Sequence, residues 1–139
     1  MTYYAVIDTN VIVSSLLKHN STPAMIVELI FTKTIIPLLN EEILQEYHEV
    51  LTRNKFGFDE NDINAFLDRL RLNSIFLERE KTFEEFADKD DIVFYEIVMC
   101  ARQTMDAYLI TGNIKHFPIR NYVVTPKQML DLIECNNIS

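Results

Sequence analysis

Carboxylate side chains stand at three separate places in this sequence from which they could serve one chemical site. Asp8 directly follows an apolar run, Glu46 lies at the border of a helical apolar stripe, and the segment 88–91 holds three carboxylates in four residues. Hard divalent cations such as Mg²⁺ prefer oxygen ligands, and proteins commonly hold Mg²⁺ with one or two carboxylates. If the fold brings these groups together, the sequence allows a divalent-metal site.

Each of these acids also has an ordinary structural interpretation. Asp and Thr are both good N-caps, so Asp8 could simply cap the helix that follows it. Glu46 could be a surface glutamate that flanks the buried stripe, as Glu49 on the same predicted helix is expected to be. Within the segment 88–91, one acid suffices as an N-cap and a second could complement the helix dipole. A third adds like-charge repulsion unless a cation lies nearby, which leaves a functional use open.

The composition bounds the class of protein. With 139 residues, 48% of them hydrophobic, the chain is expected to form a single domain, residues 1–139, with a core of its own. The formal net charge of −8 argues against a protein that coats nucleic acid by charge alone, because such binding needs Lys and Arg to neutralise phosphates. The charge does not exclude an enzyme that gathers acids around divalent cations, since bound ions offset the charge of their ligands.

Signals of location favour the cytoplasm. The first residues lack a basic segment followed by an apolar one, so they do not resemble a secretory signal. Apolar runs such as 5–7 and 92–95 are far too short to span a membrane. The two cysteines, Cys100 and Cys135, have no metal-ligand spacing and are expected to stay reduced.

Alternating strand and helix patterns must position the acids. Apolar or β-rich runs predict strands that begin at Tyr3 and end at Asp8, and at 34–38, 74–77, 107–111 and 121–124, the second of them ending near Pro37. Helical spacing predicts helices at 11–18, 23–31, 41–51, from 58–62 to about 70, 92–105 and 126–134.

Capping residues mark three of the helix starts. Thr22 is predicted to cap a helix that has Pro23 at its first position, and Thr125 is predicted to cap the last helix. Asn40 is predicted to cap the helix that carries Glu46, and the acids at 41–42 favour the dipole of its first turn.

Strands that alternate with helices indicate a parallel sheet with helices on both faces. In open parallel sheets, ligands bind at the carboxyl ends of the strands. Asp8 and Asn113 each follow a predicted strand, so both should lie at that edge of the sheet, and Asp91 at a helix start can reach it too.

Four segments, in order along the chain, resemble successive motifs of PIN domains. They are Val6-Ile7-Asp8-Thr9-Asn10-Val11, Glu46-x-x-x-Val50-Leu51-x-Arg53, Asp88-x-x-Asp91-x-x-Phe94 and Leu109-Ile110-Thr111-Gly112-Asn113-Ile114-Lys115-His116-Phe117-Pro118. The last segment is the most specific match, and it is similar to the PIN subgroup of toxin components of toxin–antitoxin pairs. The resemblance covers nearly the full chain.

This resemblance implies an α/β fold with three layers, α/β/α, whose central parallel sheet has the strand order 3-2-1-4-5. In that order strand 1 lies beside strand 4 at a topological switch point, so Asp8 and Asn113 would be neighbours. The resemblance also implies a Mg²⁺- or Mn²⁺-dependent nuclease that typically cuts single-stranded RNA and is often a homodimer. In the toxin subgroup, an antitoxin protein would be a further partner.

Carried over onto this sequence, the resemblance assigns Asp8, Glu46 and Asp91 to the metal, with Asn113 as a further catalytic position. Many PIN domains have aspartate where Asn113 stands, and the missing charge leaves open whether one or two ions bind. Supporting or substrate-binding positions would be Thr9, Asn10, Asp88, Asp90, Thr111 and Lys115. Other candidate phosphate contacts are Lys18, Arg53, Lys55, His116 and Arg120. Because crowded carboxylates repel one another, the metal-free site is expected to be partly protonated or disordered.

Two other functions remain open. A catalytically inactive PIN-like binding module would also fit Asn113 and the acidic surface. A phosphotransferase with Asp8 as its nucleophile, similar to haloacid-dehalogenase-like enzymes, would need a second aspartate two residues later, where this chain has Asn10.

Overall fold

A five-stranded parallel sheet forms the centre of the computed structural model, which describes residues 1–138. The strands lie in the order β3-β2-β1-β4-β5. This order and the flanking helices confirm the predicted three-layer fold with strand order 3-2-1-4-5. Along the chain the elements are β1 (Tyr3–Ile7), α1 (Thr9–Leu17), α2 (Thr22–Phe31), β2 (Ile35–Leu39), α3 (Glu41–Leu51), α4 (Glu60–Leu72), β3 (Ile75–Phe76), α5 (Ile92–Ala101), β4 (Ala107–Ile110), β5 (Val123–Val124) and α6 (Pro126–Ile138). Single 3₁₀ turns occur at η1 (Asn54–Phe56), η2 (Lys89–Asp91) and η3 (Ile114–His116).

The central strand β1 is covered on both faces, which explains its unbroken apolar sequence. Ala5 and Val6 have no exposed surface and Ile7 has 1%. β1 pairs with β2 on one side and with β4 on the other, and Ile7 lies opposite Ile110 in the second register. The strands β1 and β4 therefore end level with each other, and the polar residues that follow them meet at one edge of the sheet.

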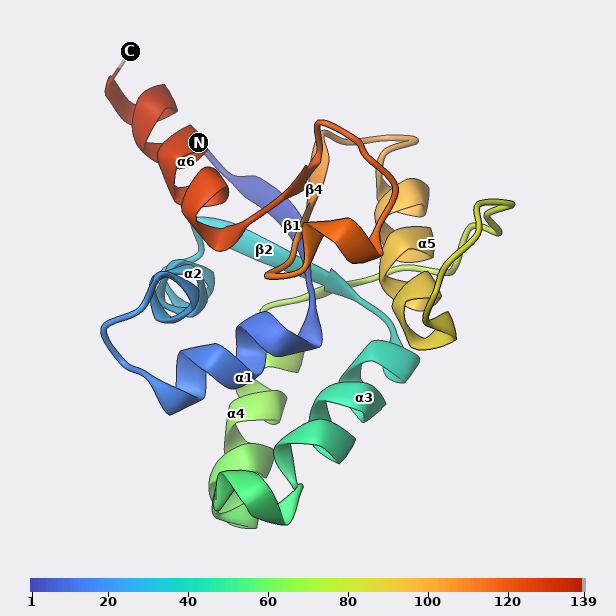
Figure 1. Ribbon diagram of the computed structural model, residues 1–139. Helices are drawn as coiled ribbons and strands as arrows, with labels where there is room; N and C mark the ends of the chain where they lie inside the picture. Colours follow the sequence, from blue (N-terminus) through green and yellow to red (C-terminus); the bar gives the residue numbers. More distant parts are fainter. Residues whose placement is uncertain (139) are drawn as a thin grey trace.

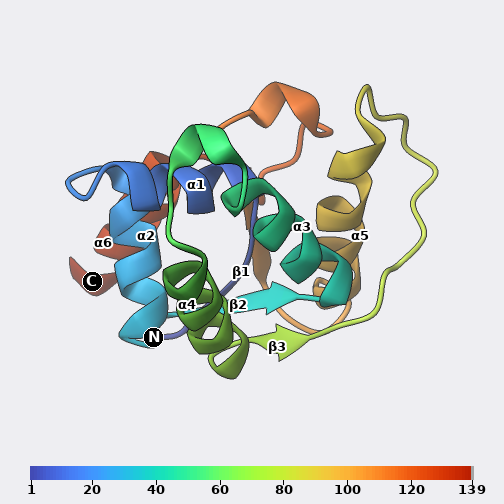
Figure 2. The ribbon, with the colours of Figure 1, turned by 90° about the horizontal axis from the view of Figure 1, so that it is seen from below.

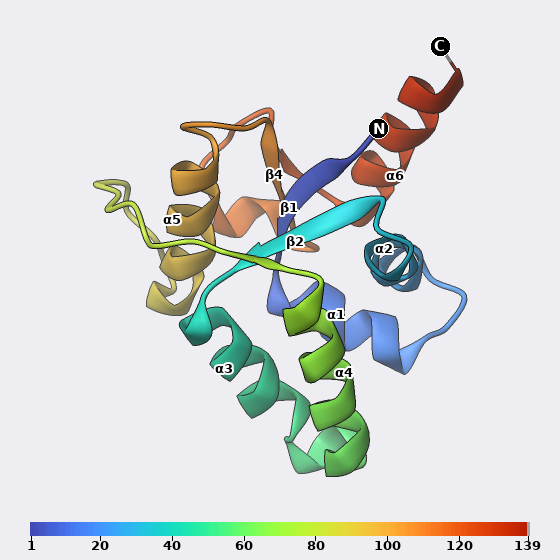
Figure 3. The same ribbon diagram turned by 180° about the vertical axis from the view of Figure 1, so that it is seen from behind.

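Helices cover both faces of the sheet. Figure 1 shows α5 on one side and α2 with α6 on the other, and α5 contacts β1, β2 and β4. In Figure 3, α1, α3 and α4 lie together beyond the end of the sheet where β1 and β2 finish. None of the helices within residues 1–138 is long and apolar enough to cross a membrane.

β2 does not end near Pro37, which corrects the expectation from the sequence. The strand continues to Leu39, and Pro37 lies opposite Ala5 in the register with β1. On the other side, β3 pairs only with Leu38 and Leu39. The backbone nitrogen of residue 37 therefore has no carbonyl of β3 to bond to. Proline, which has no N–H, is tolerated at such a position because no ladder hydrogen bond is lost.

Several helix boundaries also differ from the predictions. α1 begins at Thr9 rather than at residue 11, and α6 extends to Ile138 rather than ending at residue 134. Ser21, not Thr22, caps α2, because its side chain accepts a hydrogen bond from the Ala24 amide at 3.2 Å. α5 ends at Ala101, not Met105, and the side chain of Arg102 then donates to a backbone carbonyl beyond the turn, that of residue 107.

The predicted caps of α3 and α6 are confirmed. The Asn40 side chain accepts from the Ile43 amide at 2.9 Å. Thr125 accepts from the Gln128 amide at 3.1 Å, and the Gln128 side chain accepts from the Thr125 amide at 2.9 Å, which is a reciprocal capping box.

Candidate active site

A cleft opens at the carboxyl ends of β1 and β4, and Figure 2 shows α3 lying between α1 and α5 beside it. Its volume is about 390 Å³. The polar and charged side chains that line it are Asp8, Thr9, Asn10, Ser14, Glu46, Arg53, Lys55, Asp88, Asp90, Asp91, Asn113 and His116. The cleft thus brings together acids from three distant parts of the chain.

Asp8 is the most buried of these acids, with 6% of its surface exposed. Its amide donates to the Ile110 carbonyl at 2.9 Å, and Thr111 Oγ1 donates to Asp8 Oδ2 at 2.7 Å. Burial raises the pKa of the Asp8 carboxyl, although the hydrogen bonds from Thr111 and from the Thr9 amide oppose that rise. Asp8 occupies the N-cap position of α1, but its side chain makes no capping hydrogen bond. The capping interpretation therefore does not account for this carboxylate.

Glu46 reaches the cleft from α3 and is held by the first residue of α1. The Thr9 hydroxyl donates to Glu46 Oε2. Burial raises the pKa of Glu46, the hydrogen bond from Thr9 opposes the rise, and the nearby charges of Asp8 and Asp90 add to it. Glu46 is half-buried whereas Glu49 is exposed, which confirms the predicted position of Glu46 at the border of the buried stripe.

Asp91 presents an unpaired oxygen to the cleft. It occupies the N-cap position of α5 and, like Asp8, makes no side-chain capping hydrogen bond. Asp91 Oδ2 is buried without a hydrogen-bond partner, and His116 Nδ1 lies 3.5 Å from it. Burial and then the charges of Asp8 and Asp88 raise the pKa of Asp91 to about 6. An orphaned carboxylate oxygen among other acids is a position at which a cation would be stabilised.

The turn after β4 fixes the opposite wall. Thr111 Oγ1 accepts from the Asn113 amide at 2.9 Å while it donates to Asp8, so one hydroxyl joins the turn to the acid. Asn10 Oδ1 accepts from the Gly112 amide at 3.3 Å. A Cβ on residue 112 would lie 3.4 Å from Asn10 Oδ1, the short end of ordinary van der Waals contact, so the turn packs against the Asn10 side chain. Asn113 lines the cleft, and Asp88 Oδ1 caps η2 by accepting from the Asp90 amide at 2.9 Å.

Sequence reasoning missed a tyrosine beneath the acids. Helical spacing predicts only that Tyr47 belongs to the buried apolar stripe of α3, yet its hydroxyl donates to the Ile7 carbonyl, one residue before Asp8. Burial raises its pKa well above the ordinary value, and the charges of Asp8 and Glu46 add to the rise. The proton therefore stays on the Tyr47 hydroxyl, where it fixes the end of β1. The one signal in the sequence that Tyr47 lies near the acids is its position directly after Glu46.

Cationic and aromatic side chains of η1 line the other rim of the cleft. Lys55 and Phe56 of η1 border it together with Arg53, the N-cap residue of η1, and His116 of η3 also lines it. Arg53 also pairs with Glu49 at 3.1 Å, in a solvent-exposed contact. Three of the candidate phosphate contacts, Arg53, Lys55 and His116, thus line the same cleft as the acids. The cleft lining among the described residues does not include the side chains of Lys18, Lys115 or Arg120.

The donor set fits a hard divalent cation. The acids offer only oxygen ligands, and one of those oxygens is buried without a partner. Within residues 1–138, however, no three His, Cys, Asp or Glu side chains are grouped closely enough to hold an ion as they stand. Binding would therefore require the carboxylates to draw together, which is consistent with their mutual repulsion.

Comparison with known proteins identifies the family to which the chain belongs. Residues 4–115 match the profile of the family described as "PIN domain". The chain belongs to the PIN domain family. This PIN domain is also 29% identical, over 144 residues, to an uncharacterized protein of Methanocaldococcus jannaschii, and the match covers 93% of this chain and 90% of that protein. The family resemblance inferred from the four motifs is thereby confirmed, and since PIN domains are generally metal-dependent nucleases, membership indicates a nuclease.

Proposed function

We propose that this PIN domain is a Mg²⁺- or Mn²⁺-dependent endoribonuclease that cleaves single-stranded RNA, and that it is the toxin of a toxin–antitoxin pair. The observation that supports the nuclease most directly is the buried, unpaired Oδ2 of Asp91, which shares one cleft with Asp8 and Glu46. The toxin role is supported by the likeness of the segment 109–118 to that subgroup. The proposal includes a single domain, a homodimer, a cytoplasmic location and an antitoxin protein as partner.

In this proposal Asp8, Asp91 and Glu46 hold the ion. When bound, the ion supplies acidified water and offsets the charge of the attacked phosphate. Thr111 fixes the Asp8 carboxylate by donating to its Oδ2, and Thr9 fixes the Glu46 carboxylate by donating to its Oε2. Both hydroxyls donate to the carboxylates, so they stabilise the ionised form that a cation requires.

The neighbouring polar groups would support substrate and ligands. Asn10 holds the Gly112 amide, which keeps the turn that carries Asn113 against the start of α1. Asn113 offers a neutral amide oxygen where an aspartate would offer a charge. Asp88 and Asp90 add negative charge at the mouth of the cleft, where they would favour a second, more weakly held ion.

The rim of η1 would bind the RNA backbone. Lys55 is exposed at the edge of the cleft, where its ammonium group lies 5.1 Å from the centre of the Phe56 ring. An exposed cation–π contact of this kind is weak, so the ammonium group can exchange it for a phosphate at small cost. We expect Lys55→Glu to raise the KM for RNA about threefold or more with little change in kcat, and to lower the slope of log KM against log salt by about 1. The matched control is Lys18→Glu, because Lys18 is exposed but does not line the cleft. Equal effects of the two variants on the KM would show that Lys55 of η1 does not contact the RNA.

The decisive experiment incubates the purified chain with unstructured RNA. We expect internal cleavage that EDTA stops and that added Mn²⁺ restores, with duplex RNA of the same sequence cut more slowly. Cleavage that continues in EDTA would contradict the metal-dependent assignment.

The toxin role has its own test. Induced expression should arrest growth of the host cell, and co-expression of the cognate antitoxin should restore it. Normal growth despite cleavage in vitro would remove the toxin role and leave the nuclease.

A catalytically inactive PIN-like binding module is the second candidate. It is favoured by Asn113 and by the lack, within the described residues, of a group of three acids already close enough to share an ion. This candidate predicts RNA binding that Lys55→Glu weakens, without any cleavage in Mg²⁺ or Mn²⁺.

A further inference from the structure

One buried carboxylate, that of Glu96, does not line the cleft. The buried polar or charged side chains found among the described residues are Asp8, Thr9, Ser15, Glu96 and Thr111. Ser15 only donates to the carbonyl one turn earlier in α1. Glu96 is 6% exposed and lies among apolar residues in the middle of α5. Burying a carboxylate is costly unless it is paired and hydrogen-bonded, so its partners show what it does.

Glu96 binds the long connector between β3 and α5. Arg79 Nε and Arg79 Nη2 each lie 2.6 Å from Glu96 Oε1. The Thr82 amide donates to Glu96 Oε2 at 2.9 Å, and the Glu80 amide donates to the Glu96 carbonyl at 3.2 Å. Both carboxylate oxygens are thus satisfied, and Arg79 is fixed against α5.

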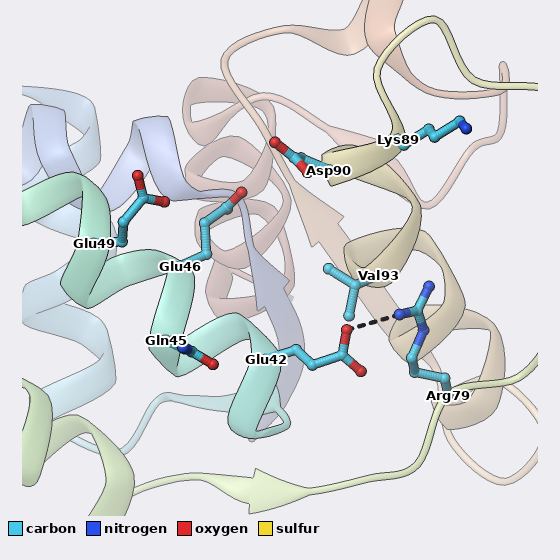
Figure 4. A pocket seen from close by; sticks show the side chains of 8 residues that line it. All are labelled: Glu42, Gln45, Glu46, Glu49, Arg79, Lys89, Asp90 and Val93. Atoms are coloured by element: carbon cyan, nitrogen blue, oxygen red, sulfur yellow. Dashed lines mark hydrogen bonds and ion pairs between the residues drawn. The ribbon is translucent and has the colours of Figure 1, made fainter.

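Arg79 uses its remaining nitrogen to reach the other acid-bearing helix. Arg79 Nη1 lies 2.8 Å from Glu42 Oε2 on α3 (Figure 4). Glu42 is four residues before Glu46, so the two side chains share one face of α3. In Figure 4, Glu46 and Asp90 point into the space between the two helices. That groove, about 350 Å³ in volume, is lined by both Glu46 and Asp90, which also line the cleft.

We propose that Arg79 is a positioning residue that sets the separation of the acids on α3 from those on α5. Its planar guanidinium bridges Glu96 and Glu42 at the same time, so the distance between the helices at this point is fixed by one rigid group. Glu46 lies one turn beyond the contact on α3, and Asp91 lies at the start of the helix that carries Glu96. The inference rests on the proposed function, in which these acids hold a cation.

A purely electrostatic role of Arg79 and a positioning role predict opposite changes in cation affinity when Arg79 is replaced. Removing the positive charge of Arg79 makes the groove more negative, which by itself would strengthen cation binding. Loss of the bridge would instead let α3 and α5 separate and weaken cation binding. The direction of the change therefore distinguishes a positioning residue from a charge that only lies nearby.

The test measures Mn²⁺ binding to the metal-free full-length chain by isothermal titration calorimetry. We expect Arg79→Met to raise the dissociation constant about tenfold, as is common when a residue that orients metal ligands is lost. Arg79→Lys keeps the charge and can still pair with Glu96, but one ammonium cannot replace both sides of the fork. It should therefore fold normally and also weaken binding, by less than Arg79→Met does.

Arg71 provides the matched control. It makes an equally short, two-pronged pair with Glu41, at 2.7 and 2.8 Å, next to Glu42 on the same helix, but it ties α3 to α4. Arg71→Met and Arg71→Lys should change the dissociation constant by less than about twofold. An unchanged or tighter Mn²⁺ affinity in the Arg79 variants, or equal weakening in the Arg71 variants, would overturn the inference.

Hydrogen exchange separates this inference from the proposed function. If the parent chain binds no Mn²⁺, the proposed metal site fails, whatever the Arg79 variants do. In the metal-free protein, Arg79→Lys should still increase amide exchange in residues 79–91 and in the first turns of α3, while Arg71→Lys should leave 79–91 unchanged. Unchanged exchange in the Arg79→Lys variant would show that Arg79 does not hold the two helices together.

Discussion

Replacing Asp8 by asparagine is expected to lower RNA cleavage by about a thousandfold or more while the fold remains intact. In the proposed mechanism Asp8 is a principal carboxylate ligand of the ion, and such a ligand contributes several kcal/mol to the reaction. The substitution keeps the size of the side chain. An amide oxygen at this position can still accept the hydrogen bond from Thr111, which is 2.7 Å long in the parent. Since burial raises the pKa of Asp8, removing its charge also relieves a desolvation cost.

The control for Asp8→Asn is Asp62→Asn. Asp62 is exposed in the first turn of α4 and does not line the cleft. Rates should be compared in Mn²⁺ with single-turnover kinetics, and circular dichroism should confirm the same fold and an equal or higher melting temperature. Cleavage by Asp8→Asn at close to the parental rate would remove Asp8 from the centre of the mechanism.

Local patterns predicted only that Asp8 and Asn113 lie at the same edge of the sheet, because each follows a predicted strand. That the two strands are neighbours was implied by the PIN resemblance, and the structure pairs β1 with β4 and joins Asp8 to the turn through Thr111. Glu46 was harder to place, since helical periodicity alone puts it only at a border. Its hydrogen bond to Thr9 depends on how α3 packs against α1, which no local pattern determines.

Two features that sequence reasoning missed are decided by tertiary contacts. The pairing of Arg79 with Glu96 joins an irregular connector to the middle of a helix that is otherwise apolar. The unpaired Oδ2 of Asp91 depends on the exact position of the turn at η2 relative to η3. The wrong cap of α2 has a local cause, because Ser21 and Thr22 are adjacent and both are good N-caps.

Neutralising Asp91 is expected to stabilise the metal-free protein at neutral pH. The fold raises the pKa of Asp91 from 3.8 to about 6, so the folded state binds this proton more tightly than the unfolded chain does. By linkage, the free energy of unfolding then falls as pH rises between those two values, and the loss is complete above pH 6. A shift of this size on a partly exposed side chain corresponds to about 1–2 kcal/mol after allowance for solvent screening.

The measurement compares the parent with Asp91→Asn by urea unfolding in EDTA at pH 4 and pH 7.5. The variant should be more stable than the parent at pH 7.5 by about 1–2 kcal/mol, and the difference should shrink toward pH 4, where the parent carboxyl is protonated in the folded state. Comparing the two proteins at each pH cancels the contributions of the other titrating groups. An Asp91→Asn variant that is less stable than the parent at pH 7.5 would contradict the burial of an unpaired charge at this position.

Added Mn²⁺ should reverse the order of stability. A ligand that binds only the folded state at a hundred times its dissociation constant stabilises a protein by about 2.7 kcal/mol, so saturating Mn²⁺ should raise the melting temperature of the parent at pH 7.5. Asp91→Asn loses the unpaired oxygen anion and should gain little from the same addition. The charge of Asp91 therefore costs stability in the metal-free protein and returns it when a cation binds, because the same burial that raises its pKa strengthens its attraction to a divalent ion. A parent whose melting temperature does not rise in millimolar Mn²⁺ would leave that charge without a function.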